Sequence, residues 1–132
     1  MTITRMLFGI QGRIRRSQYW ACTVGAWVVL LVATLLFGSA VDETTDDFSP
    51  MEAVATISWL IFLVAYFWST ICVQAKRCHD RDKTGWFQLI SFIPFIGGLW
   101  LFIELGFLDG TPGANRFGAS PKGIPDVSDA FA

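Results

Sequence analysis

The chain has 132 residues, of which 53% are hydrophobic and only 16% are charged, and its formal net charge is −1. Soluble domains carry about a quarter of charged residues, so this composition leaves too few polar side chains to coat a globule in water. It predicts one membrane-embedded domain, 1–121, followed by a polar, mobile tail, 122–132. The net charge alone says nothing about nucleic acid, but no such partner is expected, because the one basic loop is short, is partly neutralised by its own acids and lies against the membrane.

Residues 1–18 are predicted to form a helix at the membrane interface. Apolar residues recur there at helical spacing among four arginines, which is typical of a helix lying on an anionic leaflet. Gly9 and Gly12 oppose the helix, since each costs about 1 kcal/mol relative to Ala. The simpler alternative is a plain juxtamembrane anchor.

Two uncharged runs, 19–41 and 53–75, are each predicted to cross the membrane. A run of about 23 residues makes roughly 34 Å of helix, and the hydrocarbon core is about 30 Å thick. The first run is too long for the apolar part of a signal peptide, so we expect it to be retained. Ser49 is expected to cap the second span, with Pro50 in its first turn.

The third apolar run, 86–108, has two interpretations. As one helix it spans the membrane with a kink at Pro94, where a backbone hydrogen bond is lost. As two short helices it forms a re-entrant hairpin, whose turn exposes unpaired backbone at membrane depth. We therefore expect the kinked span, and an all-α bundle of three transmembrane helices. Glu104, an intramembrane polar candidate, would then lie about 27 Å from Trp86, near the far interface.

The distribution of basic residues predicts the orientation. Lys and Arg in short loops stay in the cytoplasm, and they flank the first two spans on one side only. The N-terminus and the 76–85 loop are therefore expected inside, and the acidic connector 42–52 outside. With a single third span the tail emerges outside, whereas with a hairpin it returns inside.

The 76–85 loop contains the chain's one His, His79, between Cys78 and Asp80. A zinc site needs three or four ligands at workable spacing, and a Cys-His nucleophile fails because adjacent helical residues point about 100° apart. We expect no metal, no cofactor and free cysteines, with Asp80 paired to a neighbouring arginine. Lys83-Thr84-Gly85-Trp86 is predicted to turn into the next helix, with Trp86 at the interface.

Three ordered segments resemble the DUF805 family of small bacterial inner-membrane proteins. Residues 12–20 fit its Gly-Arg-x-x-Arg-x-x-aromatic-Trp motif, and 77–86 contain its Arg-x-His-Asp and Gly-Trp elements. Residues 93–97 fit Ile-Pro-x-x-Gly, and 110–118 fit Gly-Thr-Pro-Gly followed by Asn-Arg-aromatic-Gly. The departures from the family pattern are Ile10, Lys76, Cys78 and Thr84.

The resemblance implies an inner-membrane protein without an assigned enzyme activity or cofactor. Together with the basic pattern, it indicates residues for binding anionic headgroups or a protein partner. These are Arg13, Arg16, Arg77, His79, Asp80, Arg81, Trp86, Asn115 and Arg116. If the first arginine motif, the His-Asp loop and the Asn-Arg tail form one site, the tail must return inside.

Three functional hypotheses follow. The leading one is a non-enzymatic assembly or regulatory protein that binds anionic lipid, a second copy or another membrane protein. The alternative is a small oligomeric transporter or channel component that uses Glu104 and the Pro94 kink. The third is an enzyme acting on lipid with His79 and Asp80 as acid and base.

Overall fold

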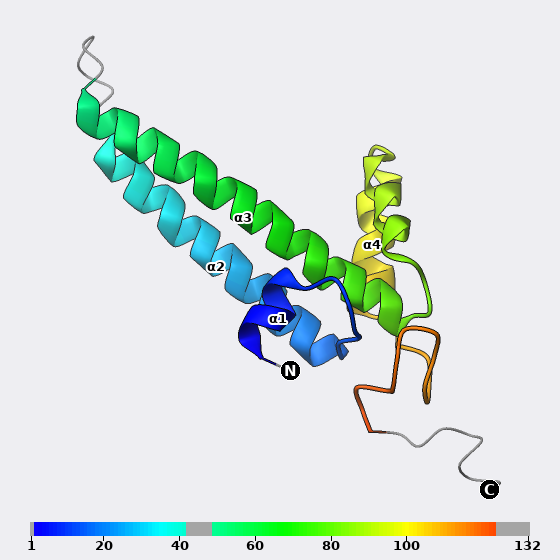
Figure 1. Cartoon of the computed structure of the whole chain (residues 1–132). Coiled ribbons are helices and arrows are strands. Elements are labelled where there is room, and N and C mark those ends of the chain that lie inside the picture. The colour runs from blue at the N-terminus through cyan, green and yellow to red at the C-terminus, as the bar shows by residue number, and fades with distance from the viewer. Residues whose placement is uncertain (1, 42–48, 124–132) are drawn as a thin grey trace, which may run out of the picture.

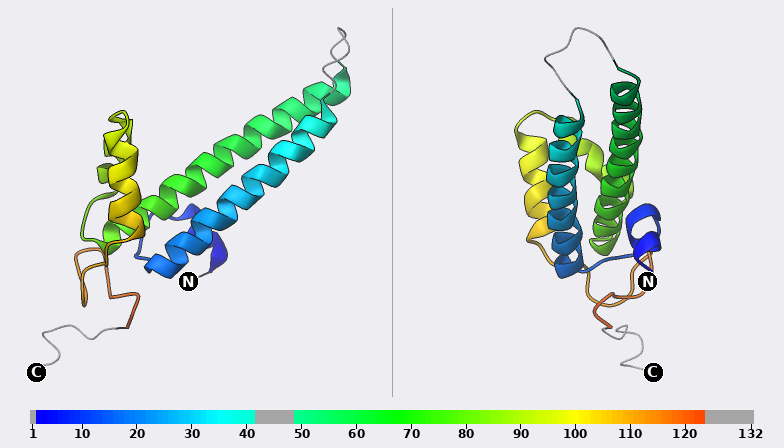
Figure 2. Two further views of the ribbon diagram at one scale, coloured as in Figure 1. Left: turned by 180° about the vertical axis from the view of Figure 1, so that it is seen from behind. Right: turned by 90° about the vertical axis from the view of Figure 1, so that its left-hand side faces the viewer.

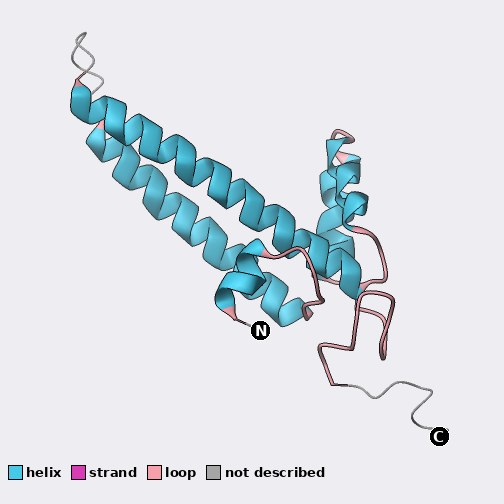
Figure 3. Cartoon of the chain, viewed as in Figure 1, coloured by secondary structure: helices cyan, strands magenta, loops and turns pink. Residues whose placement is uncertain are grey.

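The computed structural model describes residues 2–41 and 49–123. Every regular element in these ranges is a helix (Figure 3), which agrees with the all-α prediction. In chain order they are α1 (Ile3–Phe8), α2 (Arg16–Ala40), α3 (Pro50–Asp80), the 3₁₀ helix η1 (Gly85–Phe92) and α4 (Ile96–Gly106). Most of the expected acidic connector, at 42–48, and most of the expected mobile tail, at 124–132, lie outside the described residues.

Helices α2 and α3 form a long antiparallel pair (Figure 1). They have 25 and 31 residues with mean hydropathies of 2.2 and 1.8, so both are long and apolar enough to cross a membrane. Almost none of their most apolar stretches is covered by protein, 0% for α2 and 11% for α3. Helix α3 contains the second predicted run, 53–75, and α2 contains the first except for its last residue, Val41.

The start of α3 is the one predicted from its sequence. Ser49 Oγ accepts a hydrogen bond from the Glu52 amide at 3.2 Å, and the Glu52 carboxylate accepts one from the Ser49 amide at 2.7 Å. Pro50 occupies the first position of the helix, where its missing N–H leaves no bond unmade.

The expectation of one kinked span over 86–108 is wrong. This segment is a hairpin in which η1 runs away from the end of α3 and α4 returns beside it (Figures 1 and 2). The described part of the chain therefore holds two helices that could cross a membrane, not three. Helix α4 has 11 residues, about 16 Å, which is roughly half of a hydrocarbon core.

The hairpin was not expected because a turn can leave backbone N–H and C=O groups without hydrogen bonds. In this turn, backbone groups bond to one another. The amide of Ile93 bonds to the carbonyl of Ile90, that of Ile96 to Pro94, and that of Gly97 to Ile93. Gly97 also allows a close approach of the two arms, since a Cβ there would lie 1.8 Å from the Ile90 carbonyl oxygen. The hairpin therefore leaves few backbone groups unpaired, and the reason for preferring a kinked span no longer holds.

Two further boundaries differ from the predictions. The N-terminal helix α1 covers only Ile3–Phe8, and an extended segment joins it to α2. Gly12 adopts a φ of 104°, which favours glycine and ends any continuous helix over 1–18. Residues 76–80, expected in a loop, form the last turns of α3 instead.

The buried core lies at one end of the molecule. This end, called the basic end here, comprises residues 2–20, 73–87 and 101–123. Its core residues are Ile14, Tyr19, Val73, Cys78, Leu101 and Leu105. The other ends of α2 and α3 diverge from the hairpin, and no further helix of the described residues lies beside them (Figure 2). The buried core and the basic residues therefore lie at the same end of the molecule.

Candidate functional site

The Arg13 side chain connects three distant segments of the chain at the basic end. Its guanidinium forms an ion pair with Asp80 at 3.0 Å, from the last turn of α3. It also donates to three carbonyls of the C-terminal segment, those of Thr111 at 2.8 Å, Gly113 at 2.8 Å and Gly118 at 3.1 Å. Arg13 is 5% exposed, so its charge is satisfied inside the protein.

Arg77 is the second buried arginine of this cluster and is 0% exposed. It forms an ion pair with the other carboxylate oxygen of Asp80. It also donates to the carbonyls of Leu105 at 2.7 Å and Leu108 at 2.5 Å, at and just beyond the end of α4. A cation suits this position because the last carbonyls of a helix lack internal partners and carry partial negative charge.

The C-terminal segment fits against Asp80 through two neighbouring residues. The Thr111 amide donates to the Asp80 carbonyl at 2.8 Å. A Cβ on Gly110 would lie 1.9 Å from the Asp80 carboxylate, so only glycine leaves room for this contact. The Gly-Thr pair is therefore a packing requirement of the cluster.

His79 contacts the same segment on the other side of α3. Its Nδ1 lies 3.2 Å from the Gly12 carbonyl oxygen, and its backbone carbonyl accepts from Asn115 Nδ2 at 2.9 Å. Its ring stacks on Phe117, with centroids 4.1 Å apart and planes 8° from parallel. The Cζ atom of the Arg116 guanidinium lies over the Phe117 ring, 4.9 Å from its centroid.

The acid and base hypothesis for His79 and Asp80 finds no matching geometry. The Asp80 carboxylate faces Arg13 and Arg77, while His79 Nδ1 faces the Gly12 carbonyl. A carboxylate that orients a catalytic histidine must bond to its ring. These two side chains are instead parts of one buried polar cluster: Arg13, Arg77, His79, Asp80, Thr111 and Asn115.

The predicted position of Glu104 at the far interface is wrong. The hairpin returns α4 to the basic end, where Glu104 pairs with Arg81 at 2.7 Å and with Lys83 at 2.5 Å. Burial alone would raise the pKa of Glu104, but the hydrogen bonds from Lys83 and Arg81 outweigh burial and hold that pKa below its ordinary value. Glu104 is thus a paired carboxylate, and Pro94 lies in a turn. The transporter alternative loses both of its supporting observations.

Three of the predicted binding residues are exposed. Trp86 is 77% exposed at the start of η1. Arg16 pairs with Asp109 at 3.1 Å, and Arg116 pairs with Asp82 at 3.2 Å. Exposed pairs of this kind contribute about 0–1 kcal/mol, so these arginines remain available to other anions.

Sequence reasoning missed the role of Lys76, which attaches α1 to α3. Lys76 is 0% exposed, and its ammonium donates to the carbonyls of Arg5 and Met6 in α1. Trp68 and Cys72 donate to the Phe8 carbonyl at 3.2 and 3.3 Å. The signal was present, because residues 68, 72 and 76 recur every four positions on one face of α3.

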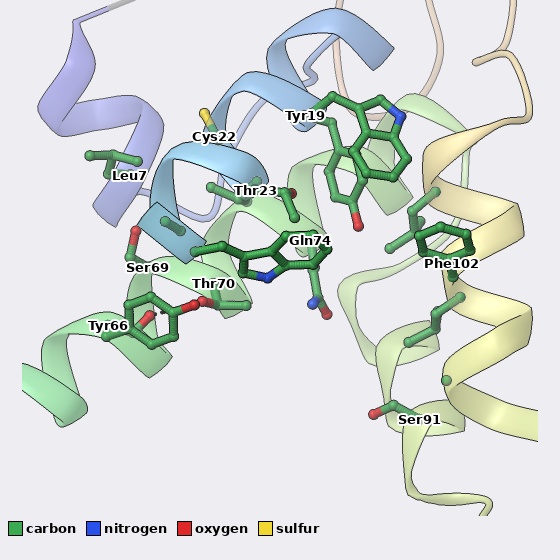
Figure 4. Close-up of a pocket in the computed structure, with 17 residues that line it drawn as sticks. Leu7, Tyr19, Cys22, Thr23, Tyr66, Ser69, Thr70, Gln74, Ser91 and Phe102 are labelled. Atoms are coloured by element: carbon green, nitrogen blue, oxygen red, sulfur yellow. Dashed lines mark hydrogen bonds between the residues drawn. The ribbon is translucent and has the colours of Figure 1, made fainter. Parts of the chain in front are cut away.

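Polar side chains also surround a cavity of about 290 Å³ between α2, α3 and the hairpin (Figure 4). Thr23 lies on its α2 wall, Thr70 and Gln74 on its α3 wall, and Ser91 on its hairpin wall. Thr70 Oγ1 donates to the Tyr66 carbonyl at 3.0 Å, one turn back along α3. The sequence showed these polar positions within apolar runs but not that they share a cavity.

Comparison with known proteins places this arrangement in a family. The model of the family described as "Protein of unknown function (DUF805)" matches residues 7–119. The chain belongs to the DUF805 family. Its match ends just after the Asn115–Gly118 turn, so it contains every residue of the buried polar cluster. The resemblance expected from the three motifs is confirmed.

Two curated relatives from Escherichia coli K12 are inner-membrane proteins. The chain is 32% identical to inner membrane protein YhaH over 122 residues, which cover 92% of this chain and 94% of YhaH. It is 30% identical to inner membrane protein YhaI over 128 residues, covering 92% and 93% of the two chains. No solved structure matches the chain. The DUF805 chain is therefore similar along almost its whole length to proteins of the bacterial inner membrane.

Proposed function

We propose that the protein crosses the bacterial inner membrane with its basic end in the cytoplasm, where it binds anionic lipid headgroups without catalysing a reaction. The observation that carries this proposal is the distribution of charge. All ten Lys and Arg residues lie at the basic end, including the two of the C-terminal segment, which the hairpin brings back. Lys and Arg near spanning helices mark the cytoplasmic side.

The exposed bases are the ones that would contact lipid. Three bases are buried and make internal contacts: Arg13, Lys76 and Arg77. Two more form ion pairs with Glu104, namely Arg81 and Lys83. The bases with exposed side chains are Arg5, Arg15, Arg16, Arg116 and Lys122. Each base near an anionic leaflet contributes about 1 kcal/mol of attraction. The proposal therefore moves the contact from the buried His-Asp region to the surface around it.

The lipid contact is tested by the lipids that the protein retains. Wild type and a triple variant are purified from bacterial membranes, and bound phosphatidylglycerol and cardiolipin are quantified by mass spectrometry. The triple variant is Arg5→Gln, Arg15→Gln and Arg116→Gln. The matched control is Thr4→Ala, Gln11→Ala and Ser17→Ala, three exposed neutral residues of the same end. Anionic lipid is expected to fall in the triple variant and not in the control; equal retention in all three would reject headgroup binding.

The orientation is tested separately with an impermeant thiol reagent on intact spheroplasts. Met51, which is 74% exposed, and Ala119, which is exposed, are each replaced by Cys. Met51→Cys is expected to react from outside, and Ala119→Cys only after the membrane is opened. Reaction of Ala119→Cys in intact spheroplasts would overturn the proposed orientation.

A further inference from the structure

A groove of about 810 Å³ runs between α3 and η1 and is separate from the exposed bases. Its apolar walls are Phe67 and Ile71 on α3 and Leu89 and Phe92 on η1. Leu89 and Phe92 are 49% and 81% exposed, so the groove opens sideways to the surroundings of the helices. From Phe67 to His79 it is about 18 Å long at the rise of an α-helix.

The groove ends at the stacked rings of His79 and Phe117. Nδ1 of His79 faces the Gly12 carbonyl oxygen, which can only accept, so Nδ1 carries the hydrogen. In the neutral ring Nε2 is then a hydrogen-bond acceptor. His79 is 7% exposed, and burial is the main factor that favours the neutral form of its ring; the positive charge of Arg116 beside Phe117 acts in the same direction.

Nε2 of His79 is open to the groove. Every fully inaccessible side-chain nitrogen or oxygen in the described residues has a hydrogen-bond partner. Nε2 has no such partner within those residues, so it must be accessible, and His79 lines the groove. Gly85 lies beside this nitrogen, because a Cβ there would be in van der Waals contact with Nε2 at 3.9 Å and would lie 3.3 Å from the Ala75 Cβ.

We propose that this groove binds a neutral amphiphile with a hydroxyl group and a long apolar body. The hydroxyl donates to His79 Nε2, and the hydrocarbon lies along Phe67, Ile71, Leu89 and Phe92. A neutral Nε2 offers no donor to a phosphate oxygen, so a lipid without a hydroxyl donor gains no hydrogen bond at this site. A lipid alcohol such as diacylglycerol and a long-chain phenol share this chemistry.

The test uses two photoactivatable lipids with the same diazirine-labelled acyl chain in membranes containing the protein. One is diacylglycerol, and the other is its methyl ether, in which O–CH3 replaces the free hydroxyl. Diacylglycerol is expected to label peptides within 67–92 about tenfold more than the methyl ether does, which corresponds to about 1.4 kcal/mol. Equal labelling by the two lipids would show that the groove takes acyl chains without reading the hydroxyl, and would overturn the proposal.

Two substitutions of His79 separate the hydrogen bond from the fold. In His79→Asn the amide retains a donor near Gly12 but has no atom at the Nε2 position, whereas His79→Gln places an acceptor oxygen there. Labelling by diacylglycerol is expected to fall about tenfold in the Asn variant and to persist in the Gln variant, at equal thermal midpoints. Undiminished labelling in a folded His79→Asn variant would reject the role of Nε2.

A filled groove gives a test that does not touch His79. Leu89→Trp replaces a leucine side chain in the groove with a larger indole ring. Leu35→Trp introduces the same ring on α2, at a residue that is 66% exposed. Only Leu89→Trp is expected to abolish labelling. Unlabelled competitors then identify the class of ligand. Loss of labelling with decylphenol, but not with its methyl ether, would assign the natural occupant to phenols. Loss of labelling with dodecanol alone would assign it to lipid alcohols. Labelling that survives Leu89→Trp would place the lipid elsewhere and overturn the proposal.

Discussion

The guanidinium of Arg13 and the carboxylate of Asp80 meet 3.0 Å apart although 67 positions separate them in the chain. Only 1% and 4% of the two side chains are exposed. Since Arg77 binds the other oxygen of the same carboxylate, Asp80 is shared by two buried cations. This single acid holds the N-terminal segment, α3 and the C-terminal segment together.

Asp80→Asn is therefore expected to destabilise the protein strongly. It leaves two buried guanidinium groups without their anion, and breaking a buried pair costs about 3–5 kcal/mol. The measurement is thermal or denaturant unfolding in lipid discs, with proteolysis of 109–123 as a local probe. Asp82→Asn removes a half-exposed acid of the same region and serves as the control, with about 0–1 kcal/mol expected. Similar losses in both variants would contradict the shared role of Asp80.

Gly97 and Gly98 provide a matched pair for the hairpin. A Cβ on Gly97 would lie 1.8 Å from the Ile90 carbonyl oxygen, whereas one on Gly98 has nothing within 4 Å. Gly97→Ala is expected to force the arms apart and cost about 1–3 kcal/mol. Gly98→Ala is expected to stabilise α4 by up to about 1 kcal/mol through helix propensity. Unfolding of both variants in lipid discs checks this; a harmless Gly97→Ala would mean that the arms do not meet there.

Glu104 predicts a specific dependence of stability on pH. Burial raises the pKa of Glu104, but the hydrogen bonds and positive charges of Lys83 and Arg81 together outweigh burial and hold that pKa below its ordinary value. A lowered pKa in the folded state contributes stability above the unfolded pKa, about 4.3, and that contribution is lost as pH falls through the folded pKa. Glu104→Gln is expected to cost about 2 kcal/mol at pH 7.

The pH profile itself provides the control for Glu104→Gln. The difference in stability between wild type and variant is expected to shrink as pH falls below about 4. Unfolding midpoints measured from pH 3 to pH 8 check this. A difference that stays constant across that range would show that the carboxylate charge is not what stabilises the protein.

Lys76→Met is expected to release α1 from α3. The ammonium of Lys76 donates to the carbonyls of Arg5 and Met6, and hydrogen bonds from charged groups contribute about 1.5–3 kcal/mol. Hydrogen exchange of the amides within Ile3–Phe8 is expected to accelerate in Lys76→Met and to stay slow in Lys76→Arg, which keeps a cationic donor. Unchanged exchange in Lys76→Met would leave the attachment of α1 to its apolar contacts alone.

The spans and the start of α3 were predictable because local rules decide them. Uninterrupted apolar length predicted the regions of α2 and α3, and the Ser-Pro-x-Glu pattern predicted the cap at Ser49. The hairpin was not predictable from length and Pro94 alone. It depends on hydrogen bonds inside its own turn and on the contact of Gly97 with Ile90, and neither is visible in one sequence.

The candidate site was predictable as a set of residues but not as a geometry. The motifs indicated Arg13, His79, Asp80 and Asn115 together, and the structure brings all four into one cluster. Sequence alone did not separate Arg77, which is 0% exposed, from Arg116, whose side chain is 57% exposed. In the sequence, a basic residue that pairs with a buried acid cannot be told from one that remains exposed. The path of the chain through the hairpin determines which bases contact an internal acid.

The short hairpin gives the molecule two different cross-sections along the axis of the α2 and α3 pair. Along that axis α1, η1 and α4 lie at the basic end, whereas the described residues place no further helix beside the other ends of α2 and α3 (Figure 2). In the orientation proposed above, each copy would displace more lipid from the leaflet at its basic end than from the other. A membrane densely populated by this protein would then hold unequal lipid numbers in its two leaflets, and this area asymmetry would be a mechanical load on the bilayer.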